Sequence, residues 1–169
     1  TEYKNLEAGH LIYIKNGDVK IIKYAESPRK AHCMFEWVYF ANVSSVLDGK
    51  SVYISRTNLV KELARQETEK TNDRDYVVVP VPDTAKAAGD AMAYELKVPA
   101  AEGLIRNRFV GRTFIEGSSR DERVQNKYTA LKEILKGKKV ILVDDSIVRG
   151  TTTKQLINYI KKVGEAKEV

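Results

Sequence analysis

The chain of 169 residues is long enough to bury a single core and too short for two large domains. Its 43% hydrophobic and 31% charged residues are typical of a soluble globular protein, and the lack of a membrane-length apolar run or a signal-like start predicts a cytoplasmic protein with no membrane partner. A net charge of +6 permits nucleic-acid binding and equally suits an enzyme with a phosphorylated substrate, which we favour. The positive residues decide little between these functions, because most of them are interspersed with acids.

The first 32 residues predict a β-hairpin. Residues 11–14 and 19–22 favour strands, and the sequence Asn16-Gly17-Asp18 between them is a strong hairpin signal. This stretch contains no phosphate-binding motif and no pair of adjacent acids. We therefore expect a short β-rich segment ahead of the main domain.

The remaining sequence alternates strands and helices. The pattern predicts strands at residues 52–54, 76–81, 100–105 and 140–143, with a further strand beginning near Lys167. Helices are expected from residue 58 to about 70, after Thr84, along a stripe from Tyr128 to Leu135, and from Thr151 or Thr152 to Gly164. Such alternation predicts an α/β fold with a mostly parallel sheet and helices on both faces.

The most informative stretch follows the unbroken apolar run at residues 140–143. Asp144 and Asp145 come first, and the loop then continues to Gly150 and the threonines that open the last helix. Open parallel sheets bind ligands at the carboxyl ends of their strands. The loop hydroxyls, the Arg149 guanidinium and the N–H groups at the start of the helix are suited to a monophosphate.

The two adjacent acids add a second capability to this loop. Carboxylates at a strand end suit ribose hydroxyls or a hard cation such as Mg²⁺. The sequence matches neither the Walker loop nor the glycine-rich dinucleotide fingerprint. The alternative is an ordinary surface turn with a capping Thr.

Three stretches resemble one family of enzymes. Residues 143–152 resemble the phosphoribosyl pyrophosphate loop of phosphoribosyltransferases, in the form found in glutamine phosphoribosylpyrophosphate amidotransferases. Residues 33–41 resemble the segment that opens the transferase domain of this family, and residues 106–115 resemble its mobile catalytic loop. The three matches occur in the order of the family, which argues against chance.

The resemblance implies a type I phosphoribosyltransferase fold for residues 33–169, with family elements continuing beyond Val169. Residues 1–32 would then be the end of the glutaminase domain and its linker. The implied reaction converts phosphoribosyl pyrophosphate and glutamine-derived ammonia to 5-phosphoribosylamine and pyrophosphate, the first step of purine synthesis. It also implies that Mg²⁺ is a cofactor and that the full-length enzyme is a homo-oligomer.

The resemblance also implies roles for individual residues. Phosphoribosyl pyrophosphate would be bound by Asp83, Asp144, Asp145, Ser146, Ile147, Val148, Arg149, Gly150, Thr151 and Thr152, and Mg²⁺ by Thr84, Asp144 and Asp145. A cationic flap with Arg106, Asn107, Arg108 and Arg112 would close over the pyrophosphate and exclude water.

Each of these assignments has an alternative. Asp83 or Thr84 alone would fit a helix N-cap, and the flap alone would fit a charged surface hairpin. The flap also departs from the family, because Arg106 replaces the usual Lys and Phe109 the usual Tyr.

Cys33 occupies the position of a cysteine that ligates an iron–sulfur cluster in some members of the family, which implies a 4Fe–4S cluster in the full-length parent. Cluster ligation needs several thiolates and this chain has one, so we expect a buried structural thiol. His10 and His32 have no partners at metal-ligand spacing and are expected to be structural or surface residues.

Two other functions remain open at this stage. A base-salvage phosphoribosyltransferase would need a hood that stacks on the base, and no aromatic-rich segment clearly supplies one. A non-catalytic sensor of phosphoribosyl pyrophosphate could use the positive charge to bind nucleic acid while lacking a working flap.

Overall fold

The computed structural model describes residues 5–68, 71, 74–108, 124 and 126–169. The chain divides into two compact units, Thr1–Met34 and Phe35–Val169, which are described separately. No helix in the described part of the chain has the length and apolarity needed to cross a membrane.

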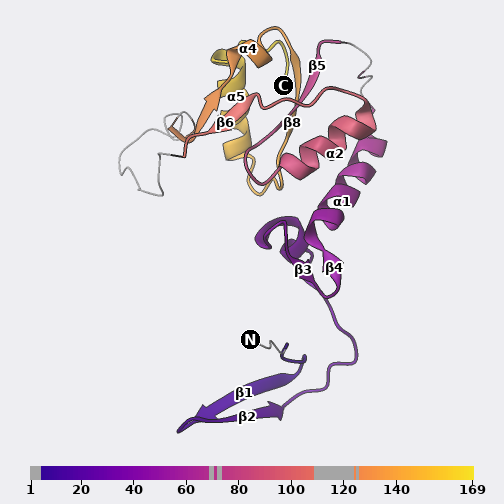
Figure 1. Cartoon of the computed structure of the whole chain (residues 1–169), viewed down its shortest axis with the longest axis vertical. Coiled ribbons are helices and arrows are strands. Elements are labelled where there is room, and N and C mark those ends of the chain that lie inside the picture. The colour runs from indigo at the N-terminus through magenta and orange to yellow at the C-terminus, as the bar shows by residue number, and fades with distance from the viewer. Residues whose placement is uncertain (1–4, 69–70, 72–73, 109–123, 125) are drawn as a thin grey trace. The chain divides into compact units, whose positions relative to one another are not determined.

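The first unit contains the hairpin that the sequence predicts. Strand β1 (His10–Lys15) pairs antiparallel with β2 (Asp18–Lys23) (Figure 1). Lys15 lies opposite Asp18 at the turn. Asn16 and Gly17 form the two-residue turn with φ of 51° and 87°, as a type I′ turn requires.

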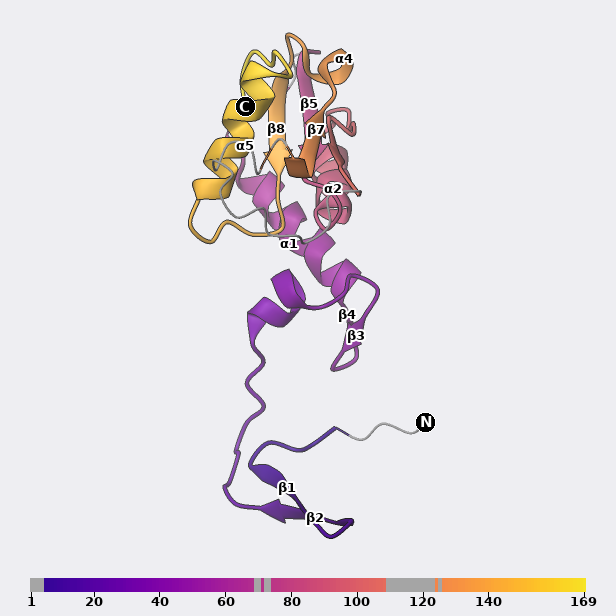
Figure 2. The ribbon, with the colours of Figure 1, turned by 90° about the vertical axis from the view of Figure 1, so that its left-hand side faces the viewer.

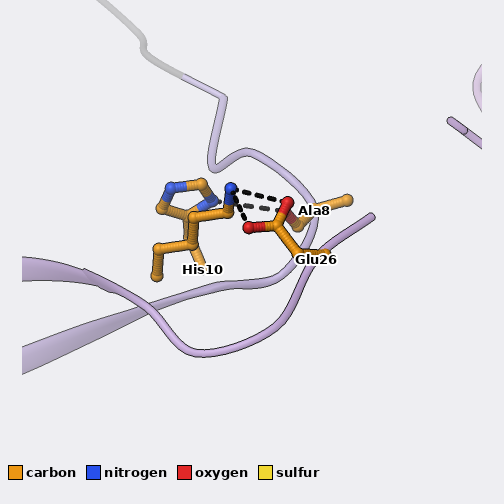
Figure 3. Close-up of polar contacts among 4 residues, drawn as sticks. Ala8, His10 and Glu26 are labelled. Carbon is orange, nitrogen blue, oxygen red and sulfur yellow. Dashed lines mark hydrogen bonds and ion pairs between the residues drawn. The ribbon is translucent and has the colours of Figure 1, made fainter. Parts of the chain in front are cut away.

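His10 lies at the base of this hairpin. Its Nδ1 is 3.2 Å from the Ala8 carbonyl oxygen (Figure 3). Lys23, opposite His10 in the hairpin, forms an ion pair with Glu26 at 2.7 Å. His10 therefore has a local structural contact, as expected.

The second unit begins with a short helical turn, η1 (Glu36–Phe40), and a small hairpin of β3 (Val46–Leu47) and β4 (Lys50–Ser51). Helix α1 (Val52–Gln66) follows directly. The predicted strand at residues 52–54 is wrong, because the Ser51 side chain accepts a hydrogen bond from the Ile54 N–H at 3.3 Å and so caps a helix that starts at Val52.

A parallel pair of strands forms the centre of this unit. Strand β5 (Tyr76–Pro80) pairs with β8 (Lys139–Val143), with Pro80 opposite Val143. Single parallel bridges extend the pairing on both sides, from Val78 to Ala100 and from Lys139 to Glu168. The predicted parallel arrangement is confirmed, although the strands expected at residues 100–105 and from Lys167 contribute only these bridges to it.

Two short strands form a separate antiparallel ladder. Strand β6 (Leu104–Arg106) pairs with β7 (Tyr128–Ala130), and Arg106 lies opposite Tyr128. The helix predicted from Tyr128 is therefore wrong, and only α4 (Lys132–Leu135) is helical there. Tyr128 and Ala130 are buried while Thr129 between them is exposed, which is the period of a strand.

Helices cover both faces of the parallel pair (Figure 2). Val77 and Val79 of β5 pack in one core with residues of α5 (Thr151–Lys162). Val78 faces the opposite way and packs in a second core with α1 and α2 (Lys86–Leu96). Successive side chains of this buried strand thus point to opposite faces of the sheet, and helices cover each face, as the sequence predicts.

Candidate functional site

A cavity of about 620 Å³ lies beyond the carboxyl ends of β5 and β8. Because the two strands are parallel and in register, the loops that follow them meet at the same edge. The cavity is lined by Tyr39, Val81, Pro82, Asp83, Thr84, Arg106, Lys127, Tyr128, Asp144, Asp145, Ser146, Val148, Arg149, Gly150, Thr151, Thr152 and Thr153.

The loop after β8 brings two half-buried carboxylates to this cavity. The Asp145 N–H donates a hydrogen bond to Asp144 Oδ1 at 2.9 Å, and the Ser146 hydroxyl donates to Asp145 Oδ1 at 2.9 Å. Burial raises the pKa of the Asp144 carboxyl above its ordinary value, and the neighbouring Asp145 charge adds to this effect. The Asp145 N–H and the Lys127 ammonium act in the opposite direction.

The start of α5 forms the other side of the same loop. Gly150 precedes the helix with a φ of +68°, in the left-handed region that glycine adopts readily. No side chain caps this end of the helix, and Thr151, Thr152 and Thr153 line the cavity. Backbone N–H groups and hydroxyls are therefore available here to a phosphate.

Ile147 is the one residue of the predicted loop that does not line the cavity. It is 69% exposed, whereas the other predicted ligand-binding residues between Asp144 and Thr152 all contribute to the wall.

The loop after β5 supplies the opposite wall. Asp83 and Thr84 both line the cavity, and the peptide between Pro82 and Asp83 is cis. Helix α2 starts only at Lys86, with Ala85 as its first flanking residue and no side-chain cap. The N-cap interpretation of Asp83 and Thr84 is therefore wrong.

The described part of the predicted flap reaches the cavity at one residue. Arg106 lines it and forms an ion pair with Asp83, with Nη1 3.3 Å from Oδ2. Asn107 and Arg108 are not in the cavity wall, although the Asn107 N–H donates to the Lys127 carbonyl oxygen at 2.9 Å. Arg112 lies outside the described residues.

Lys127, Tyr128 and Tyr39 are cavity residues that sequence patterns missed as site residues. Lys127 belongs to no motif in the sequence, so no pattern singled it out. Tyr39 lies inside the segment 33–41 that resembles the family, which was the only available signal for it.

The two carboxylates of the loop after β8 suit Mg²⁺ better than they suit a metal ion whose ligands all come from the protein. Mg²⁺ commonly takes one or two carboxylates and completes its shell with water and substrate phosphates. Asp144 and Asp145 offer that number of carboxylates, and no cluster of three or more His, Cys, Asp or Glu residues occurs within the described ranges.

Cys33 is not the buried thiol that we expected. Its side chain is exposed, so the prediction of a buried structural thiol is wrong. An iron–sulfur cluster requires several thiolates, and these 169 residues contain only Cys33, so the cluster implied for the full-length parent stays a prediction.

Comparisons with known proteins agree on one family. A family model described as a phosphoribosyl transferase domain matches residues 42–169. Curated proteins named amidophosphoribosyltransferase match nearly the whole chain: one from Archaeoglobus fulgidus is 44% identical over 98% of it, and one from Pyrococcus horikoshii is 40% identical over 100%. The chain spans 36% of the length of each of these relatives.

Solved structures show the same similarity. A structure described as glutamine phosphoribosylpyrophosphate amidotransferase from B. subtilis complexed with ADP and GMP is 35% identical, with a TM-score of 0.77. The match covers 97% of this chain and 35% of that one. A structure described as the allosteric regulatory enzyme of purine biosynthesis matches with the same values.

Proposed function

The chain belongs to the phosphoribosyl transferase domain family, and on that premise we propose that it is the phosphoribosyltransferase part of an amidophosphoribosyltransferase. The proposed reaction joins ammonia to the ribose of phosphoribosyl pyrophosphate and releases pyrophosphate. In a longer protein the ammonia comes from glutamine through a glutaminase domain, and that protein is a cytoplasmic homo-oligomer. The observation that carries the proposal is the meeting of the loops after β5 and β8 at one cavity.

The two sides of the cavity suit the two ends of the substrate. The N–H groups and hydroxyls at the start of α5, with Arg149, would bind the 5-phosphate. Asp83, Thr84 and Arg106 on the opposite wall would face the pyrophosphate. The ribose would then lie between them, beside Asp144 and Asp145.

The carboxylates have a direct role in the proposed chemistry. As ammonia attacks the anomeric carbon, the bond from that carbon to the pyrophosphate oxygen breaks, and the electron pair leaves with the pyrophosphate. Positive charge develops on the ribose, where the charges of Asp144 and Asp145 stabilise it. Thr84, Asp144 and Asp145 would hold Mg²⁺, which supplies positive charge to the leaving pyrophosphate when it is bound.

The proposal is tested by binding and by turnover. Calorimetry should detect binding of phosphoribosyl pyrophosphate in the presence of Mg²⁺, and addition of ammonia should release pyrophosphate. Asp144→Asn should lower the rate of release by about 100-fold, because it removes a charge that stabilises the transition state. The matched control is Asp90→Asn on the exposed face of α2, which should leave the rate unchanged.

The outcomes separate the alternatives. If folded protein binds no phosphoribosyl pyrophosphate with Mg²⁺, the proposal is wrong. Binding without ammonia-dependent release would favour the non-catalytic sensor, and release that depends on a purine or pyrimidine base would favour the salvage enzyme. The relatives favour neither alternative, since those compared above carry the amidotransferase name.

A further inference from the structure

One backbone N–H group of β7 points away from the β6–β7 ladder. The Leu131 N–H donates to the Gly103 carbonyl oxygen at 2.9 Å, so Leu131 is at a hydrogen-bonded position of the pair. Because such positions alternate along an antiparallel pair, the preceding residue, Ala130, is at a non-hydrogen-bonded position. Ala130 is only 8% exposed, so its N–H needs a partner outside the ladder.

Tyr159 of α5 supplies that partner. Its hydroxyl oxygen accepts a hydrogen bond from the Ala130 N–H at 3.4 Å. Its side chain is partly buried and packs against the core that contains Ala130 and Leu156. A buried backbone N–H that lacks a partner destabilises the arrangement that buries it. The Tyr159 hydroxyl therefore fixes where β7 lies against α5.

The two elements joined by Tyr159 each contribute to the cavity wall, but Tyr159 itself does not. Thr152 at the start of α5 lines the cavity, and Tyr159 follows on the same side of the helix, about two turns and about 10 Å further along its axis. At the other element, Tyr128 of β7 and Arg106 of its partner strand β6 line the cavity. The Tyr159 hydroxyl thus links two parts of the wall from outside the cavity.

We propose that Tyr159 is a positioning residue, which sets the distance between the start of α5 and the β6–β7 ladder to the span of the substrate. This inference rests on the proposed function, in which the 5-phosphate lies at the start of α5 and the pyrophosphate faces Arg106. Phosphoribosyl pyrophosphate is one covalent molecule, so both of its ends fit only when the two parts of the wall are correctly spaced. A fragment that binds at one part alone does not depend on that spacing.

The test compares the whole substrate with its two fragments in the wild type, Tyr159→Phe and Tyr94→Phe. Tyr94 is 81% exposed on α2, so its variant controls for the loss of one phenolic hydroxyl. Tyr159→Phe should lower kcat for ammonia-dependent release of pyrophosphate about tenfold or more, because small displacements of groups that hold a substrate cost large factors in rate. Calorimetry should find that Tyr159→Phe binds ribose 5-phosphate, and separately pyrophosphate with Mg²⁺, within about twofold of the wild type.

Tyr94→Phe should match the wild type in the rate and with both fragments. An unchanged kcat in Tyr159→Phe would overturn the inference while leaving the proposed function intact. So would a loss of affinity for either fragment as large as the loss in kcat, because Tyr159 would then support one part of the wall or the fold as a whole. Failure of the wild type to release pyrophosphate with ammonia would instead overturn the proposed function, and the inference with it.

A second measurement does not depend on the folding of any variant. In the wild type, saturating ribose 5-phosphate should slow deuterium exchange of the Ala130 amide, because a ligand that stabilises α5 also stabilises the bond from Ala130 to Tyr159. The Gly89 amide, which donates to the Ala85 carbonyl oxygen at the start of α2, is the control and should keep its exchange rate. An unchanged exchange rate at Ala130 would contradict the link between α5 and β7.

Discussion

Asp144 lines the cavity at a cost in the stability of the folded state. Its carboxyl is half-buried beside a second carboxylate, and burial is the main cause of its raised pKa. A buried charge without a full set of partners destabilises the folded state, and functional sites commonly carry such costs. Under the proposed function, contact of Asp144 with a cation or with ribose hydroxyls would offset this cost.

The raised pKa of Asp144 predicts a pH-dependent gain in stability for Asp144→Asn. Between the ordinary pKa of 3.8 and the raised pKa, the folded state binds more protons than the unfolded state, so the free energy of unfolding falls as pH rises through this window. The amide has no such penalty. Thermal unfolding should therefore give a higher melting temperature for the variant near pH 7, with a difference that shrinks towards about pH 4. A difference that is constant with pH would contradict this cause.

Sequence patterns correctly predicted those cavity-lining residues that follow one another along the chain. The run from Asp144 to Thr152 is readable because a buried strand, a polar loop and a helix follow one another without interruption, and only Ile147 of that run misses the cavity. Lys127 and Tyr39 come from other parts of the chain. Their placement depends on the β6–β7 ladder and on η1, which local periodicity did not reveal.

At the scale of elements, two predictions were wrong, the strand at residues 52–54 and the helix from Tyr128. In both places, capping or strand pairing outweighs the hydrophobic periodicity of the sequence. The Ser51 side chain converts an apparent strand into the first turn of α1. Tyr128 has helical spacing to Leu131 and Leu135, but its pairing opposite Arg106 makes it part of a strand. The buried strand at residues 140–143 was correctly predicted because its run of apolar residues reflects burial on both faces.

Arg56 joins two elements of the second unit. It is only 6% exposed on α1, and its guanidinium donates hydrogen bonds to the carbonyl oxygens of Trp37 at 2.8 Å and Ala41 at 3.0 Å. These two residues belong to η1 and its end, so one side chain ties η1 to α1. Tyr39 of η1 lines the cavity, so the contacts of Arg56 help to hold the element that carries Tyr39.

Replacement of Arg56 should therefore destabilise the protein. Arg56→Ala leaves two carbonyl groups without these partners and removes a buried side chain, so the free energy of unfolding should fall by about 2–4 kcal/mol. Arg65→Ala, on the same helix, removes only an exposed ion pair with Glu62 and should cost under about 1 kcal/mol. Urea unfolding of both variants measures the contrast, and equal losses would show that burial of Arg56 does not stabilise the fold.

At the scale of the whole molecule, the fold class and the family were predictable from sequence. The alternation of strands and helices sets a parallel sheet with helices on both faces, and the structure confirms it. The family assignment depended on three short motifs, because composition and charge suit many proteins. The relatives compared above are longer proteins, and the chain spans about a third of their length.

The distribution of burial predicts that the second unit is the stable one. Every buried hydrophobic residue of the described chain lies between Val52 and Ile160, whereas no described residue of the first unit is buried. A chain that begins at Phe35 should therefore unfold with a free energy within about 0.5 kcal/mol of that of the full chain, as expected for changes away from a core. A peptide of the first 34 residues should be largely unfolded, since an isolated two-stranded hairpin is only marginally stable in water. Urea unfolding and circular dichroism measure both; a loss above about 2 kcal/mol on removal of the hairpin would mean that it stabilises the second unit after all.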